Sequence, residues 1–115
     1  MEKGRINLKI YVQNILLDIN TAIPLGLIVN ELITNSLKHA FPEGKRGNIS
    51  VYFHQLDENY EFIVKDNGIG FPEDLDLNNT NSLGLQIIKV LTTQINGQIE
   101  LENNNGTEIK IKFKD

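Results

Sequence analysis

Three polar residues of one predicted helix have the types and spacing to handle a metal ion and a phosphate. Glu31, Asn35 and Lys38 lie in the run 24–41, and intervals of four and three residues place them along one helix face, with His39 at its margin. A carboxylate and an amide oxygen can bind a metal ion, and a lysine can meet phosphate oxygens. The same face could also be an ordinary solvated one, and the helix alone does not decide between the two.

A second candidate site directly follows a predicted strand, where Asp66, Gly68 and Gly70 form an Asp-x-Gly-x-Gly motif. Glycines without a Cβ let the backbone approach a ligand and take positive φ. An acid just before them can accept a hydrogen bond from a donor such as an exocyclic amine. The alternative is a plain turn, because Asp-Asn-Gly is common in turns. The motif lacks the third glycine of a dinucleotide fingerprint, and the chain contains neither a P-loop nor the protein-kinase signature set.

Two shorter motifs follow. Ser82-Leu83-Gly84-Leu85 opens a predicted helix, where backbone N–H groups favour an anion and Gly84 would let phosphate oxygens approach. The alternative is a simple helix cap at Ser82. Thr107 enters the last predicted strand after a glycine and can hydrogen-bond inward to Asp66 or to a water. Neither motif identifies a site by itself.

Hydrophobic periodicity predicts the elements that position these motifs. A first helix is expected over residues 24–41, capped by Asn20 or Thr21 and closed by Pro42 and Gly44. A second is expected over residues 83–95, with its apolar edge along Leu83, Ile87, Val90, Leu91 and Gln94. The predicted strands are residues 6–12, 49–54, 60–65, 98–102 and 108–114, with a brief further strand at 15–18.

This order of elements predicts an α+β fold. We expect a mixed, mostly antiparallel sheet of about five strands with the helices stacked on one face. The length of 115 residues favours a single domain over residues 1–115.

The composition limits the classes of function. Hydrophobic residues make up 40% and charged residues 23%, which are globular values. The absence of cysteine excludes disulfides and thiolate metal sites and is compatible with the cytosol. The net charge of −4 argues against a nucleic-acid partner or an anionic membrane surface. No apolar run approaches the roughly 20 residues of a membrane span, and the start has no signal-peptide core, so any anchor is expected outside this chain.

Taken together in this order, the four motifs resemble the Bergerat-fold ATPase superfamily, which includes gyrase, heat-shock chaperone, sensor histidine kinase and mismatch-repair ATPase domains. The segments NELITNSLKHAF, DNGIGFP and SLGLQII are similar to the catalytic domain of a two-component sensor histidine kinase. The subgroup they most resemble has a dimerisation domain of the HisKA_2 type. The resemblance runs from residue 15 to residue 113 and implies the two-layer α/β sandwich of the Bergerat fold.

The resemblance implies a role for each polar residue. Asn35 matches the N-box asparagine whose side-chain oxygen helps to hold Mg²⁺. Glu31 matches an acid that activates water in the hydrolytic branches and, in kinases, can instead assist the attacking histidine. Lys38 and His39 match positions that approach the phosphates, and Asp66 matches the acid that reads the adenine amino group.

The glycines take their roles from the same resemblance. Gly68 and Gly70 match the first glycine box, and Gly84 with Leu85 matches the second, beside the phosphates. Thr107 matches a threonine near the adenine. Residues 71–83 would then form the ATP lid, which is short and lacks the separate phenylalanine-containing box of many sensor kinases, so its mode of closure stays open.

The implied activity is binding of Mg·ATP and transfer of the γ-phosphoryl group to a histidine on a separate dimerisation domain, with a response regulator downstream. Neither His39 nor His54 has the surroundings of a phosphoacceptor helix, so the acceptor is expected elsewhere in a cytoplasmic parent protein. The isolated domain is expected to be a monomer without direct membrane contact. Two alternatives stay open: an ATP-hydrolysing or serine-kinase member of the same fold, of the anti-sigma-factor type, and a non-catalytic nucleotide-sensing module.

Overall fold

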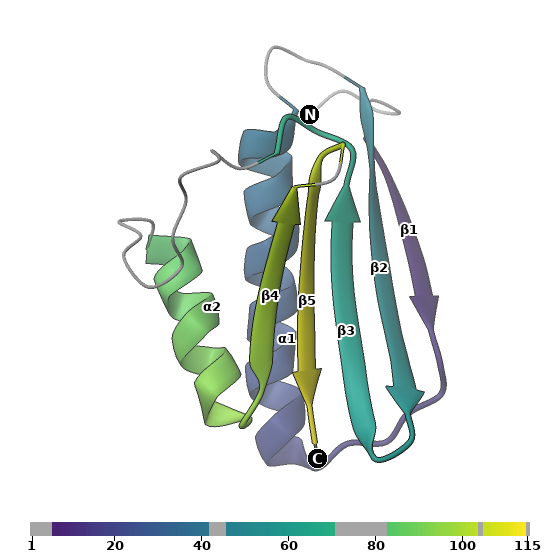
Figure 1. Ribbon diagram of the computed structural model, residues 1–115, viewed down its shortest axis with the longest axis vertical. Coiled ribbons are helices and arrows are strands. Elements are labelled where there is room, and N and C mark those ends of the chain that lie inside the picture. Colours follow the sequence, from purple (N-terminus) through teal and green to yellow (C-terminus); the bar gives the residue numbers. More distant parts are fainter. Residues whose placement is uncertain (1–5, 42–45, 71–82, 104, 115) are drawn as a thin grey trace.

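The computed structural model describes residues 6–41, 46–70, 83–103 and 105–114, and it consists of one sheet with two helices on one face (Figure 1). The strands are β1 (Ile6–Val12), β2 (Gly47–Leu56), β3 (Asn59–Asp66), β4 (Gln98–Asn103) and β5 (Thr107–Phe113). They lie in the order β1-β2-β3-β5-β4. Only the β1–β2 pair is parallel. The predicted α+β fold, with a mixed and mostly antiparallel five-stranded sheet, is confirmed.

The first helix begins earlier than predicted. α1 (Ile19–Asn35) starts five residues before Pro24, which lies inside the helix. The cap is Asp18, whose carboxylate accepts a 2.8 Å hydrogen bond from the backbone N–H of Asn20. The expected caps Asn20 and Thr21 were therefore wrong, and so was the brief strand at residues 15–18, because those residues lead directly into this cap.

The end of the first helix also differs from a regular helix. After Asn35 the chain continues as a single π-helical turn, η1 (Ser36–Ala40). Such turns widen the helix and often occur at functional sites. They also change the direction of the side chains that follow, so Lys38 does not continue the regular spacing of Glu31 and Asn35. Lys38 is exposed.

The hydrophobic core lies between the helices and the sheet face that they cover. It includes Leu25, Ile28 and Leu32 from α1, Leu85 and Ile88 from α2 (Leu83–Gln94), and residues of β2, β3 and β5. The predicted apolar edge of α2 was right only in part, because Leu91 packs against the core but Leu83, Val90 and Gln94 are exposed. The buried residues of this helix are Leu85, Ile88 and Thr92. No helix in the part of the chain described here is long and apolar enough to cross a membrane.

One edge of the sheet extends beyond the helices. β1 is an edge strand, at the end of the sheet that lies away from α1 and α2 (Figure 1). Its residues Leu8, Ile10 and Val12 are each about half exposed. Lys9 lies between them in the sequence and is exposed as well.

Candidate functional site

The carboxylate of Asp66 is the centre of the site. It ends β3, and the side chain is buried at 5% exposure. Ser36 donates its hydroxyl hydrogen to Oδ2 at 2.9 Å. The backbone N–H groups of Gly68 and Thr107 both donate to Oδ1, at 3.0 Å and 3.2 Å. Three donors from the first helix, the loop after β3 and the start of β5 thus fix one buried carboxylate, as a buried polar group requires.

The register of the sheet creates this arrangement. Asp66 pairs directly with Thr107 in the antiparallel β3–β5 ladder. The end of β3, the start of β5 and the end of α1 lie at the same end of the molecule (Figure 1). The predicted inward hydrogen bond from Thr107 to Asp66 is present, and it is made by the backbone amide rather than by the hydroxyl.

Two glycines allow the loops beside Asp66 to pack closely. Gly106 has φ +134°, and a Cβ there would collide with the backbone of Asp66 and Asn67. Gly70 has φ +78°, and its Cβ would lie 3.1 Å from Asn103 Oδ1. Both positions combine positive φ with a near neighbour, which suits glycine and disfavours other residues. The positive φ expected of the first glycine box is therefore present at Gly70.

A second group of predicted residues meets at the start of α2. A Cβ placed on Gly84 would lie 3.0 Å from Glu31 Oε2 and 3.2 Å from both side-chain atoms of Asn35, Oδ1 and Nδ2. Glu31 and Asn35 are half-buried and lie one turn apart on α1. The glycine thus allows the carboxylate and the amide to lie against the first turn of α2, where helix N–H groups favour negative charge.

Other predicted residues are placed less fully. The side chain of Leu85 is buried in the core, so any contact with a ligand would come from its backbone. Lys38 is exposed in η1, one turn beyond Asn35. The side chain of His39, the cap Ser82 and residues 71–82 of the lid predicted at 71–83 lie outside the described residues, whereas Leu83 is the first residue of α2.

Sequence reasoning missed Ser36. Its position in the helical repeat could have indicated it, because Ser36 lies one turn after the buried positions Leu25, Ile28 and Leu32. In the structure Ser36 is 9% exposed. A polar residue at a core position must find a hydrogen-bond partner, and an acid elsewhere in the chain is a natural one.

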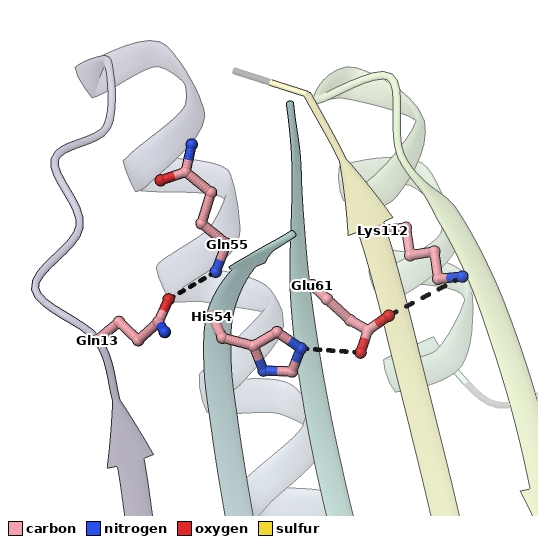
Figure 2. Close-up of polar contacts among 5 residues, drawn as sticks. All are labelled: Gln13, His54, Gln55, Glu61 and Lys112. Atoms are coloured by element: carbon pink, nitrogen blue, oxygen red, sulfur yellow. Dashed lines mark hydrogen bonds and ion pairs between the residues drawn. The ribbon is translucent and has the colours of Figure 1, made fainter. Parts of the chain in front are cut away.

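The opposite face of the sheet carries a separate polar cluster, shown in Figure 2. His54 Nε2 lies 3.1 Å from Glu61 Oε1, and Lys112 Nζ lies 3.9 Å from Glu61 Oε2. The three residues occupy directly paired positions on β2, β3 and β5. Nearby, Gln13 Oε1 accepts a 2.8 Å hydrogen bond from the backbone of Gln55. His54 thus lies on β2 and contacts its cross-strand partner Glu61.

A shallow pocket of about 380 Å³ also opens on this opposite face. Asn48, Ser50, Lys65 and Asn67 are among its lining residues. The alternation of the strands directs Ser50 and Lys65 away from the helices. Asp66 contributes to its wall from the other side of the sheet.

The side-chain oxygens beside Gly84 are of the kind that can bind a magnesium ion together with the phosphate oxygens of a ligand. No cluster of three or more histidine, cysteine or acidic side chains occurs in the described ranges. Mg²⁺ does not need such a cage, because it usually keeps several waters and takes one or two protein oxygens together with substrate phosphates. Asn35 Oδ1 and the carboxylate of Glu31 are such oxygens, and the absence of a side chain at Gly84 lets both lie against the first turn of α2.

Comparison with known proteins agrees with this geometry. Residues 20–115 match the family described as Histidine kinase-, DNA gyrase B-, and HSP90-like ATPase. Blue-light-activated histidine kinase 2 of Erythrobacter litoralis is 29% identical over 111 residues, which are 95% of this chain and 32% of that protein. Serine-protein kinase RsbW of Listeria innocua is 33% identical over 85 residues, which are 62% of this chain and 54% of that protein.

A solved structure has the same fold. The histidine kinase domain of the Erythrobacter litoralis blue-light activated histidine kinase superposes with a TM-score of 0.89 at 27% identity. The match covers 97% of this chain and 52% of that domain, so the chain spans about half of its length. The chain therefore belongs to the family of histidine kinase-, DNA gyrase B- and HSP90-like ATPases, as an ATP-binding domain of the histidine kinase type.

Proposed function

We propose that this domain binds Mg·ATP and transfers the γ-phosphoryl group to a histidine supplied by another domain of its parent protein. The observation that carries the proposal is the convergence of motif residues from distant parts of the chain. Ser36, Gly68 and Thr107 hold the carboxylate of Asp66, while Glu31 and Asn35 lie against Gly84. One group can bind a base and the other can bind phosphates.

The base would be read by Asp66. Its buried carboxylate accepts hydrogen bonds and is held in one orientation, which suits the exocyclic amino group of adenine. A site built to hydrogen-bond such a group strongly disfavours a ligand that lacks it, because the buried polar atom is then left unpaired.

The phosphates would lie at the first turn of α2. Asn35 would hold Mg²⁺, which when bound neutralises phosphate charge. The helix N-terminus at Gly84 and Leu85 adds backbone N–H donors, and Lys38 adds a side chain at the margin. The family resemblance gives His39 a role at the phosphates as well. Glu31 is close enough to the same place to accept a proton from an attacking nucleophile. Catalysis would then rest on positioning and on electrostatic stabilisation.

Titration of the chain with Mg·ATP by calorimetry tests binding. We expect saturable heat for the unaltered chain and much weaker binding for Asn35→Ala, which removes the metal-binding oxygen. The matched control is Asn30→Ala, an exposed amide on the same helix, which should bind normally. A lack of binding heat across a wide range of nucleotide and Mg²⁺ concentrations would contradict the proposal.

Transfer is tested with the phosphoacceptor domain of the parent protein. The resemblance favours a dimerisation domain of the HisKA_2 type, followed by a response regulator, in a cytoplasmic setting. Incubation with γ-labelled ATP should place acid-labile label on a histidine of that domain, and Glu31→Ala should slow the transfer while ATP still binds.

A serine kinase is the second candidate, favoured by the similarity to RsbW. The two activities differ in the chemistry of the product, because phosphoserine survives acid treatment and phosphohistidine does not. Acid-stable label on a partner protein, with none on a histidine domain, would favour the serine kinase. Steady phosphate release that needs Glu31, with transfer to neither, would favour a hydrolytic role.

A further inference from the structure

Ser36 is a buried hydroxyl whose partner is the proposed base-reading residue. It follows Asn35 directly, is 9% exposed and donates to Asp66 Oδ2 at 2.9 Å. We propose that Ser36 is a positioning residue that fixes the carboxylate of Asp66 and thereby makes the site select a purine with an amino group at C6. The inference rests on the proposed binding of a nucleotide by this domain.

Among the described residues, the hydrogen bonds to Asp66 leave one of its acceptor directions unused. A carboxylate has about four lone-pair sites, two on each oxygen. The amides of Gly68 and Thr107 occupy Oδ1, and Ser36 occupies one side of Oδ2. The remaining lone pair on Oδ2 is therefore the acceptor available to a ligand.

The position of that acceptor depends on Ser36. Both amide donors bind Oδ1 and come from the sheet and the loop beside it, whereas Ser36 comes from the helix layer and binds Oδ2. The terminal torsion of an aspartate is broad, so anchoring one oxygen leaves the other free to swing. The hydroxyl of Ser36 fixes the second oxygen and hence the direction of its free lone pair.

The same hydrogen bond sets the polarity that a base would meet. Because Ser36 gives its only hydroxyl hydrogen to Asp66, it has none to offer to a keto oxygen. Ser36 and Asp66 together present acceptors. Acceptors match the amino group at C6 of adenine and oppose the keto oxygen at C6 of guanine, so the pair selects by attraction and by repulsion.

The test measures selectivity rather than affinity alone. ATP, GTP and purine riboside triphosphate, which lacks the amino group, are each titrated with Mg²⁺ into the chain and its variants by calorimetry. We expect Ser36→Ala to bind ATP about tenfold more weakly and to bind the amine-free nucleotide almost unchanged, since a hydrogen bond to a charged group is lost. The preference for ATP should shrink by the same factor, and Ser36→Thr should restore it by returning the hydroxyl.

The matched control is Thr92→Val. Thr92 is 2% exposed and donates its hydroxyl hydrogen to the carbonyl oxygen of Ile88 at 2.7 Å, within α2. Its removal also deletes a buried hydroxyl, but it should leave the preference for ATP over the amine-free nucleotide unchanged. A change in this ratio for Thr92→Val as large as that for Ser36→Ala would overturn the specific role of Ser36.

The remaining outcomes distinguish a failure of the role proposed for Ser36 from a failure of the proposed nucleotide binding. Unchanged selectivity in folded Ser36→Ala, with normal ATP binding by the unaltered chain, overturns the inference and leaves the proposed function standing. If the unaltered chain binds no nucleotide, both are wrong. Should circular dichroism show that Ser36→Ala is unfolded, Ser36→Cys replaces it, with similar size and a weaker donor. The same loss of selectivity is expected, and an unchanged ratio there overturns the inference.

Discussion

At the scale of single residues, the site depends on where each polar atom finds its partner. Asp66 was identifiable from its place before two glycines, but its fixed orientation was not, because its three donors come from three other parts of the chain. Ser36 was not predicted as a site residue, because the motif on this helix was assigned to its neighbour Asn35. Glu31 and Asn35 were expected on one helix face, which could bind a ligand or be merely solvated, and the structure places both beside the start of the second helix.

The variant Asp66→Asn should weaken ATP binding by about tenfold or more while the fold survives, since an amide places a donor where an acceptor is needed. The asparagine oxygen can still accept from Gly68 and Thr107, so the loop should keep its shape. Calorimetry measures the affinity and circular dichroism the fold. Unchanged affinity would show that Asp66 does not read the base.

The variant Gly84→Ala should lower phosphoryl transfer while it changes the stability of the fold little. A new methyl group would lie 3.0 Å from Glu31 Oε2 and should displace Glu31 and Asn35, so phosphoryl transfer should fall at least tenfold. The fold should lose little, because alanine favours a helix over glycine by about 1 kcal/mol. The control Gly26→Ala meets nothing within 4 Å in α1, so it should stabilise the fold by a similar amount and leave transfer intact. Equal activity in both variants would contradict this role of Gly84.

At the scale of elements, strands were predicted better than helix boundaries. Alternation of apolar and polar residues defines a strand locally, and all five strands were found close to their predicted limits. Pro24 suggested a helix start, yet the helix begins at Ile19 because Asp18 caps it. In α2 apolar residues occur on several sides, so the periodicity could not show which ones the sheet would bury.

The observed cap gives a direct test of this boundary. Asp18→Ala should lower the free energy of unfolding by about 1 kcal/mol, because the N–H of Asn20 loses its acceptor. Asn20→Ala, at the residue first expected to be the cap, should cost much less. Denaturant unfolding of both variants measures the two losses. A larger loss of unfolding free energy for Asn20→Ala than for Asp18→Ala would show that Asp18 is not the cap.

At the scale of the whole molecule, the site spans both layers of the fold. Asp66 and Thr107 belong to the sheet, whereas Ser36, Asn35 and Gly84 belong to the helices. The family resemblance predicted this assembly, since composition and periodicity do not fix how the two layers dock. A ligand that contacts both layers binds only the folded chain and should therefore stabilise it as a unit.

Thermal unfolding measures this coupling. At a Mg·ATP concentration of 100 times Kd, binding adds about 2.7 kcal/mol, which corresponds to a rise in Tm of about 10 °C for a chain of this size. Asp66→Asn should lose most of the shift at the same nucleotide concentration. A rise of equal size in that variant would show that the nucleotide stabilises the fold from somewhere else.

The uncovered strand β1 has a consequence for the solubility of the isolated domain. Within the described sheet its outer edge has no neighbouring strand, and three of its apolar side chains are half exposed, so it is a template for strand-to-strand aggregation. Lys9 in the middle of this edge opposes such pairing by charge. Lys9→Val should therefore promote concentration-dependent self-association, visible by light scattering, while the monomer keeps its ATP affinity. A variant that stays monomeric at high concentration would show that Lys9 does not protect the edge.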